Sequence, residues 1–157
     1  MTVSPAVATI LRDIIGLEQV DEENQLHVRL ADAITNAGPG ASFGARVVAL
    51  RYVFNWALNA AGKEFGTAKA NYEHFIAKTK TRLLAEPKMS VAKAEAMAEA
   101  DDEAYRLKLE YLLAEQQERS MRKFLDTLES ALDNHRTDRA DQRAADRASA
   151  QGYGGGA

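Results

Sequence analysis

The chain has 157 residues, of which 46% are hydrophobic and 27% charged, and its formal net charge is −3. No segment approaches the roughly 20 apolar residues that span a bilayer, and the N-terminus lacks the basic-then-apolar pattern of an export signal. The absence of cysteine excludes disulfides and thiolate metal sites and fits a cytoplasmic location.

The first 44 residues predict two short helices followed by a glycine hinge. Ser4 and Pro5 form a helix start, because a capping hydroxyl precedes a proline that needs no amide partner. An apolar face follows and Gly16 ends this helix. A second helix is expected over residues 21–37, and the glycine- and proline-rich residues 38–44 form the hinge.

One long helix is expected over residues 45–86, which contain no proline and carry apolar residues at spacings of three and four. Gly62 and Gly66 interrupt its pattern and expose backbone on one face, which would allow a close helix approach or a bend. Pro87, Lys88 and Met89 make the turn.

The last helix is expected to run unbroken over residues 90–148 and to carry a coiled-coil seam along residues 97–132. At 1.5 Å per residue it would be roughly 88 Å long. The pattern therefore predicts an all-α fold: a long antiparallel helical hairpin or coiled coil over residues 45–148, two short N-terminal helices, and a flexible glycine-rich tail over 149–157. The large side chains expected in the seam are Met97, Leu107, Tyr111, Met121, Leu125, Leu128 and Leu132.

A second apolar stripe, made of Tyr105, Leu109 and Leu112, lies beside or away from this seam. A two-helix hairpin would leave it exposed to water, and apolar groups on two faces of a long helix usually indicate a third helix or a neighbouring chain. Single exposed apolar residues are also normal in monomers. We favour a homo-oligomer.

Charge is divided into blocks along the hairpin. Residues 45–89 carry 8 basic and 3 acidic groups, and residues 90–134 carry 6 basic and 11 acidic groups, so the two arms can attract each other. The basic groups gather near the turn, with the aromatic rings of Tyr72 and Phe75 nearby, as in sites that bind phosphates and stack bases. The alternative is a lysine-rich tip that is merely soluble. These basic residues are Lys78, Lys80 and Arg82, with Lys88 and Lys93 flanking the turn.

A second basic feature is an arginine stripe near the C-terminus. Arg136, Arg139, Arg143 and Arg147 fall within an arc of about 80° at 100° per residue. Arginine without lysine favours a bidentate partner such as phosphate or carboxylate. Interleaved aspartates also allow a salt-bridged surface with no partner.

No catalytic or metal-binding constellation is recognisable. His27, His74 and His135 lie far apart on three expected helices, and the glycine loop lacks the Gly-Lys-Ser/Thr ending of a phosphate-binding loop. The acidic run over residues 99–103 is more typical of a solvated helix face near an N-terminus than of a metal cluster. We therefore expect neither an enzyme nor a cofactor.

Two stretches carry a family resemblance. Ala68-Lys69-Ala70-Asn71-Tyr72 precedes the basic residues 78–82, and Ala100-Asp101-Asp102-Glu103 precedes Leu107-Lys108-Leu109. These stretches resemble the Ala-Lys-x-x-Tyr helix with its basic continuation, and the acidic lead-in with its Leu-Lys-Leu start, of UvsY-type recombination mediators of tailed bacteriophages. The resemblance covers about residues 45–148. The alternating arginines and aspartates near the C-terminus, and the first 44 residues, depart from it.

The resemblance implies a helical protein that forms ring-like homo-oligomers in the host cytoplasm, binds single-stranded DNA and helps a recombinase displace the single-strand-binding protein. It adds Lys69 to the expected DNA-binding residues. The alternative function is a coiled-coil adaptor, a virion component or an inhibitor of a host protein, each acting only through protein–protein contacts.

Overall fold

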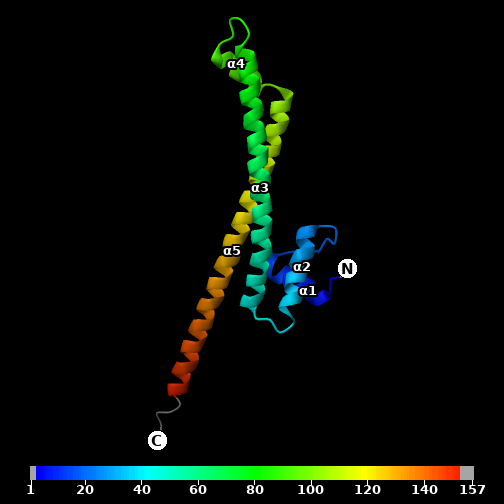
Figure 1. The fold of residues 1–157 in the computed structure, drawn as a ribbon. Helices are drawn as coiled ribbons and strands as arrows, with labels where there is room; N and C mark the ends of the chain where they lie inside the picture. The colour runs from blue at the N-terminus through cyan, green and yellow to red at the C-terminus, as the bar shows by residue number, and fades with distance from the viewer. Residues whose placement is uncertain (1–2, 153–157) are drawn as a thin grey trace. The chain divides into compact units, whose positions relative to one another are not determined.

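The computed structural model describes the backbone of residues 3–152 and the side chains of residues 3–149. Within that range it contains five helices and no strand, so the predicted all-α class is confirmed. The long helices α3 and α5 pack against each other as a helical hairpin that follows two short helices (Figure 1). The helices are α1 (Pro5–Ile15), α2 (Gln25–Ala37), α3 (Phe43–Leu84), α4 (Val91–Glu99) and α5 (Asp102–Gly152).

Short polar side chains set the starts of the two N-terminal helices. Ser4 caps α1 with Pro5 in the first turn, as the sequence predicted, and Asn24 caps α2. The expected start of the second helix at Asp21 is wrong. The Asp21 carboxylate instead accepts a hydrogen bond from the Glu23 amide and closes a turn ahead of the helix.

Helix α3 is continuous from Phe43 to Leu84. Gly62 and Gly66 lie inside it, and a side chain built at either position would meet no atom within 4 Å. Of the two roles that the sequence allowed for these glycines, a close helix approach or a bend, the close approach is therefore wrong. Gly66 is exposed and Gly62 is partly buried, and neighbouring elements leave open space at both positions.

The single helix expected over residues 90–148 is instead two helices. Helix α4 ends at Glu99, and Asp101 then caps α5, its side-chain oxygen lying 2.9 Å from the backbone nitrogen of Glu103. Aspartate favours such a cap over a helix interior, because its carboxylate competes for free backbone amides. The chain therefore breaks and restarts between two otherwise good helical stretches.

The turn and the tail also differ from expectation. The connection between α3 and α4 covers residues 85–90, and Lys88 within it has a left-handed φ of 66°. Helix α5 continues to Gly152, so the first four residues of the expected flexible tail are helical. Residues 153–157 of that tail lie outside the described residues.

The helices group into two compact units, each with its own core. Unit 1 comprises residues 1–55 and 124–157 and holds α1, α2, the start of α3 and the C-terminal part of α5. Unit 2 comprises residues 56–123 and holds the rest of α3, all of α4 and the start of α5.

The core of unit 1 joins all four of its helical segments. Leu11 of α1, Leu30 of α2 and Leu50 of α3 are almost completely buried. Phe54 of α3 stacks on Phe124 of α5 with 4.7 Å between ring centroids. Burial of such large apolar side chains stabilises the fold by about 1.5–3 kcal/mol each.

The core of unit 2 is narrower. Ala94 and Ala98 of α4 are completely buried, which allows α4 to pack closely on its neighbours. Further along α3, the Tyr111 ring of α5 stacks on both Phe65 and Tyr72, at centroid distances of 5.7 and 6.2 Å. Aromatic pairs at such distances add stability beyond the area they bury.

Most of the residues predicted for the seam face the core of their own unit. Leu107, Leu128 and Leu132 are buried, and Tyr111, Met121 and Leu125 are partly buried. Met97 differs, with 44% of its surface exposed. It lies on α4, where the helix break shifts the phase of the pattern and turns Ala94 and Ala98 inward instead.

Candidate nucleic-acid interface

The basic residues predicted near the turn do not form one cluster. Lys78 and Arg82 lie one turn apart on one flank of α3, and both are exposed. At 100° per residue, Lys80 lies about 160° around the helix from Lys78. Its ammonium group is 3.2 Å from the carboxylate of Glu95 on α4. Lys80 therefore serves the packing of unit 2, and the structure separates it from the other two cations.

Lys78 and Arg82 border a groove of about 500 Å³ in unit 2. Phe75 and Thr79 of α3 also line it, and Asp101 and Glu103 at the start of α5 form the opposite wall. The groove is thus basic on one side and acidic on the other, and the aromatic Phe75 lines it from the same helix as the two cations. The sequence pointed to Phe75 and the two cations, but it did not place the two carboxylates beside them.

The acidic wall is held in place by the first turns of α5. The Asp101 side chain caps the helix, and Glu103 and Glu110 both form ion pairs with Arg106. The hydrogen bond from the Arg106 guanidinium lowers the pKa of the Glu103 carboxyl, and the charge of the same group adds to this effect. Glu103 is therefore negatively charged throughout the neutral range.

The remaining predicted cations of unit 2 are peripheral. Lys69 lies 3.9 Å from Glu73 one turn further along α3, a loose surface pair that contributes little. Lys88 is exposed in the turn after α3. Among the described residues, Lys78, Arg82 and Lys88 have no ion-pair partner.

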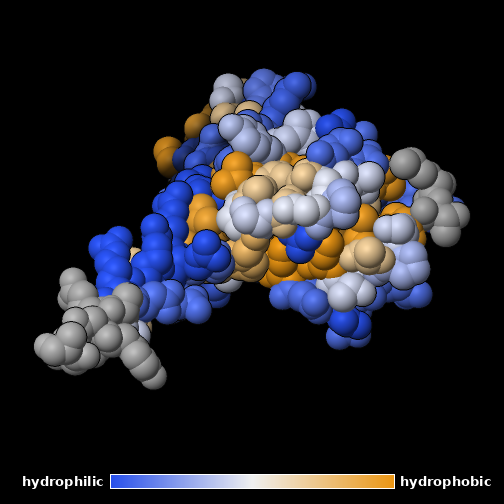
Figure 2. All heavy atoms as spheres, turned by 90° about the horizontal axis from the view of Figure 1, so that it is seen from below, coloured by the Kyte–Doolittle hydropathy of each residue, from blue (hydrophilic) through white to orange (hydrophobic). Residues whose placement is uncertain are grey.

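The C-terminal arginines belong to unit 1. The side chains over residues 136–149 are all exposed, and Figure 2 shows the C-terminal part of α5 as hydrophilic on the side in view. Arg136 pairs with Asp133 at 3.2 Å, and the Nε of Arg143 donates to the backbone oxygen of Arg139. The stripe is therefore partly neutralised on its own helix.

The second apolar stripe is exposed, as the sequence predicted for a hairpin without a neighbour. Tyr105, Leu109 and Leu112 are 70%, 46% and 45% exposed. Sequence reasoning missed Leu113, which is 62% exposed beside them. The signal that could have identified Leu113 is that these four large apolar residues all fall within positions 105–113.

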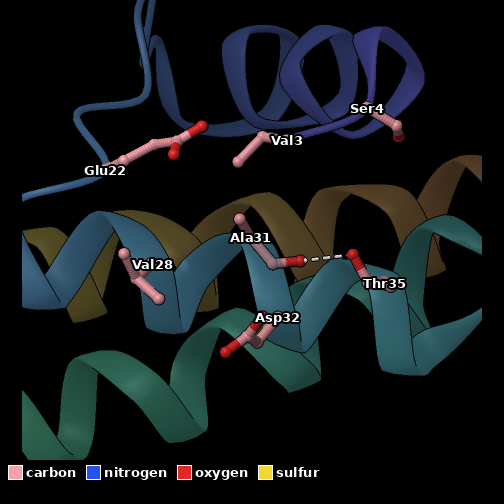
Figure 3. A pocket seen from close by; sticks show the side chains of 7 residues that line it. All are labelled: Val3, Ser4, Glu22, Val28, Ala31, Asp32 and Thr35. Atoms are coloured by element: carbon pink, nitrogen blue, oxygen red, sulfur yellow. Dashed lines mark hydrogen bonds between the residues drawn. The ribbon is translucent and has the colours of Figure 1, made fainter. Parts of the chain in front are cut away.

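A further hollow lies in unit 1 between α1 and α2, with a volume of about 290 Å³ (Figure 3). Its walls are mostly apolar, with two carboxylates, and the Thr35 hydroxyl in it donates to the Ala31 backbone oxygen at 2.8 Å. None of the predicted cations reaches it. The residues lining it are Val3, Ser4, Glu22, Val28, Ala31, Asp32 and Thr35.

Neither metal-type clusters nor bilayer-length apolar helices occur in the described part of the chain. No three His, Asp or Glu side chains among these residues gather in a way that could hold a metal ion. None of the described helices has an apolar stretch of the length that crosses a membrane. The sequence matches no family model, and neither a curated protein nor a solved structure matches it.

Proposed function

We propose that this protein is an accessory factor of DNA recombination that binds single-stranded DNA as a homo-oligomer, in the manner of UvsY-type mediators. The observation that carries the proposal is the groove of unit 2. There Lys78 and Arg82 stand beside Phe75, and neither cation has an ion-pair partner among the described residues. Cations next to an aromatic face are the combination that single-stranded nucleic acids require.

The two walls of the groove set how a strand lies in it. Phosphates are attracted to Lys78 and Arg82 and repelled by Asp101 and Glu103, so the sugar–phosphate backbone follows the basic edge of α3. The bases then turn into the groove toward Phe75, where carboxylate oxygens accept hydrogen bonds from exocyclic amino groups. A duplex keeps its bases stacked inside, so this arrangement favours a single strand.

Two cations per chain give weak binding, because each phosphate contact contributes little and is screened by salt. Several copies on one strand add their contacts and raise the affinity without any new interaction. Homo-oligomerisation is therefore part of the function. The recombinase and the single-strand-binding protein are the further partners that this role requires.

The test is a mobility-shift or anisotropy titration with a single-stranded oligonucleotide at about 50 mM salt. Replacing Lys78 and Arg82 together by glutamate should abolish binding, since it reverses the basic wall. The matched control replaces Lys63 and Lys93 by glutamate. Both side chains are exposed in the same unit, and the two substitutions change the net charge by the same amount. Binding unchanged by the Lys78/Arg82 double variant, or lost equally in the control, would refute the groove as the site.

A second candidate function is an adaptor that touches only proteins. It is favoured by Tyr105 and Leu113, whose exposure is unusual for side chains of this size on a helix that is otherwise polar on that side. Salt separates the two functions. Binding to DNA weakens steeply as salt rises, whereas apolar assembly does not, and a complete lack of DNA affinity at about 50 mM salt would favour the adaptor.

A further inference from the structure

The exposed apolar stripe of α5 points away from the helix pair that forms the core of unit 2. Tyr105, Leu109 and Leu112 fall within an arc of about 60° at 100° per residue, and Leu113 lies at its edge. Around the axis of α5, the middle of this arc is about 160° from the middle of the positions that face the core, such as Leu107. The stripe is thus a separate face of the helix.

Within unit 2 this face has no cover. The four side chains are between 45% and 70% exposed, and they adjoin one another on a single helix. Contiguous apolar surface of this kind on a soluble protein usually marks an interface. The charges that flank the stripe indicate what binds there.

The flanking charges have a two-fold pattern about a point midway between Leu109 and Leu112. Asp102 and Arg119 are equally distant from this point, on opposite sides of it. Asp102 has no ion-pair partner among the described residues, and Arg119 is 69% exposed and pairs only with Glu115 on its own helix. Arg106 and Glu115 are related by the same symmetry.

We propose that a second copy of this chain lies antiparallel on this face, with a two-fold axis between Leu109 and Leu112. Leu109 of one copy then packs on Leu112 of the other, and Tyr105 faces Gln116. Asp102 of each copy meets Arg119 of the other. Each contact occurs twice, as in any isologous interface.

The parallel alternative is disfavoured by the same charges. It would place Asp102 against Asp102 and Arg119 against Arg119, and like charges at flanking positions oppose pairing. The proposed contacts all come from α5, whereas Lys78 and Arg82 belong to α3. This inference rests on the homo-oligomer of the proposed function and specifies one contact between its copies.

Disulfide trapping tests the geometry directly, because the protein contains no cysteine. Leu109→Cys and Leu112→Cys variants are purified with different tags, mixed and oxidised. The antiparallel arrangement predicts that the mixed disulfide, which joins position 109 of one copy to position 112 of the other, clearly exceeds the half share that random pairing of equal amounts would give. Predominant like-with-like disulfides, or no disulfide at concentrations where the chain associates, would overturn the proposal.

Sedimentation equilibrium tests the energetics. Leu109→Glu with Leu112→Glu should weaken self-association at least about tenfold. The matched control, Thr67→Glu with Ala70→Glu, has the same spacing on an exposed face of α3 and should leave self-association unchanged. Equal self-association of the two double variants, with helix content preserved in both, would also overturn the proposal.

A charge exchange separates this contact from general surface repulsion. Asp102→Arg and Arg119→Asp should each weaken association, and the two changes together should restore it. Failure of the combined variant to recover would exclude the antiparallel register. DNA titrations of the same proteins distinguish the failure of this inference from the failure of the proposed function. If the protein forms dimers but binds no single-stranded DNA, only the DNA-binding role is contradicted.

Discussion

Lys80 of α3 and Glu95 of α4 form an ion pair with 3.2 Å between the ammonium nitrogen and the carboxylate oxygen. The pair joins α4 to the basic end of α3 and removes one of three cations that the sequence grouped together. The pair therefore identifies Lys80 as a structural cation, in contrast to Lys78 and Arg82, which border the groove.

Reversing the charge of Lys80 should therefore lower the stability of the fold without weakening DNA binding. The Lys80→Glu variant places two carboxylates together and should lower the free energy of unfolding by about 1 kcal/mol or less, because both side chains are partly exposed. Adding Glu95→Lys restores an attractive pair and should recover most of the loss in urea titrations. If Lys80→Glu alone weakened DNA binding as strongly as the Lys78/Arg82 variant, Lys80 would belong to the DNA site.

The break between α4 and α5 leads to a second prediction. Asp101→Ala removes the side chain that caps α5 and should lower the free energy of unfolding by about 1 kcal/mol. Hydrogen exchange should show the largest loss of protection at the first amides of α5. Asp126→Ala, at an exposed position inside the same helix, is the control and should have little effect. Equal effects of the two changes would mean that Asp101 is not a cap.

The sequence predicted the hairpin because its signals are periodic. Leu107, Leu128 and Leu132 lie at multiples of the helical repeat, and such a pattern fixes which face is buried regardless of the partner. The break at Ala100 and Asp101 has no such signature. The alanines and acidic residues around it favour helix, and whether an aspartate caps a helix or lies inside one depends on tertiary packing.

The candidate site was predictable in part for the same reason. The 100° rotation per residue already separates Lys78 from Lys80, so their division between two flanks was contained in the sequence. The partner of Lys80 was not, because Glu95 reaches it only once α4 folds back as a separate helix. The acidic wall of the groove depends on the same break, which brings Asp101 beside the basic flank of α3.

The two glycines inside α3 give a third prediction. Gly62 and Gly66 have helical surroundings and open space, so replacing either by alanine should raise the free energy of unfolding by about 0.5–1 kcal/mol. Gly16→Ala is the contrasting control. Its φ of 68° strains any side chain, so that change should destabilise the protein. Thermal unfolding measures all three, and destabilisation by the α3 changes would show that the bare backbone serves a contact.

The Glu103–Arg106 ion pair gives a prediction about pH. The hydrogen bond from Arg106 lowers the pKa of the folded Glu103 carboxyl below its ordinary value of 4.5. A carboxyl with a lowered pKa contributes stability above its unfolded pKa and loses that contribution as the pH falls through the folded pKa. Glu103 therefore supports the start of α5 at neutral pH and ceases to do so only in acid below about pH 4.5.

Carboxyl titration by NMR measures this pKa directly. Arg106→Gln removes the charge and the two guanidinium hydrogen bonds and leaves at most a weaker neutral one, so the pKa of Glu103 should rise toward 4.5 and the loss of stability in acid should become shallower. Arg119→Gln is the matched control, because Arg119 pairs with Glu115 on the same helix and does not contact Glu103. A Glu103 pKa that stayed low without Arg106 would assign the effect to the amides and dipole at the helix start instead, since these attract a carboxylate in the first turn whatever the side chain at position 106.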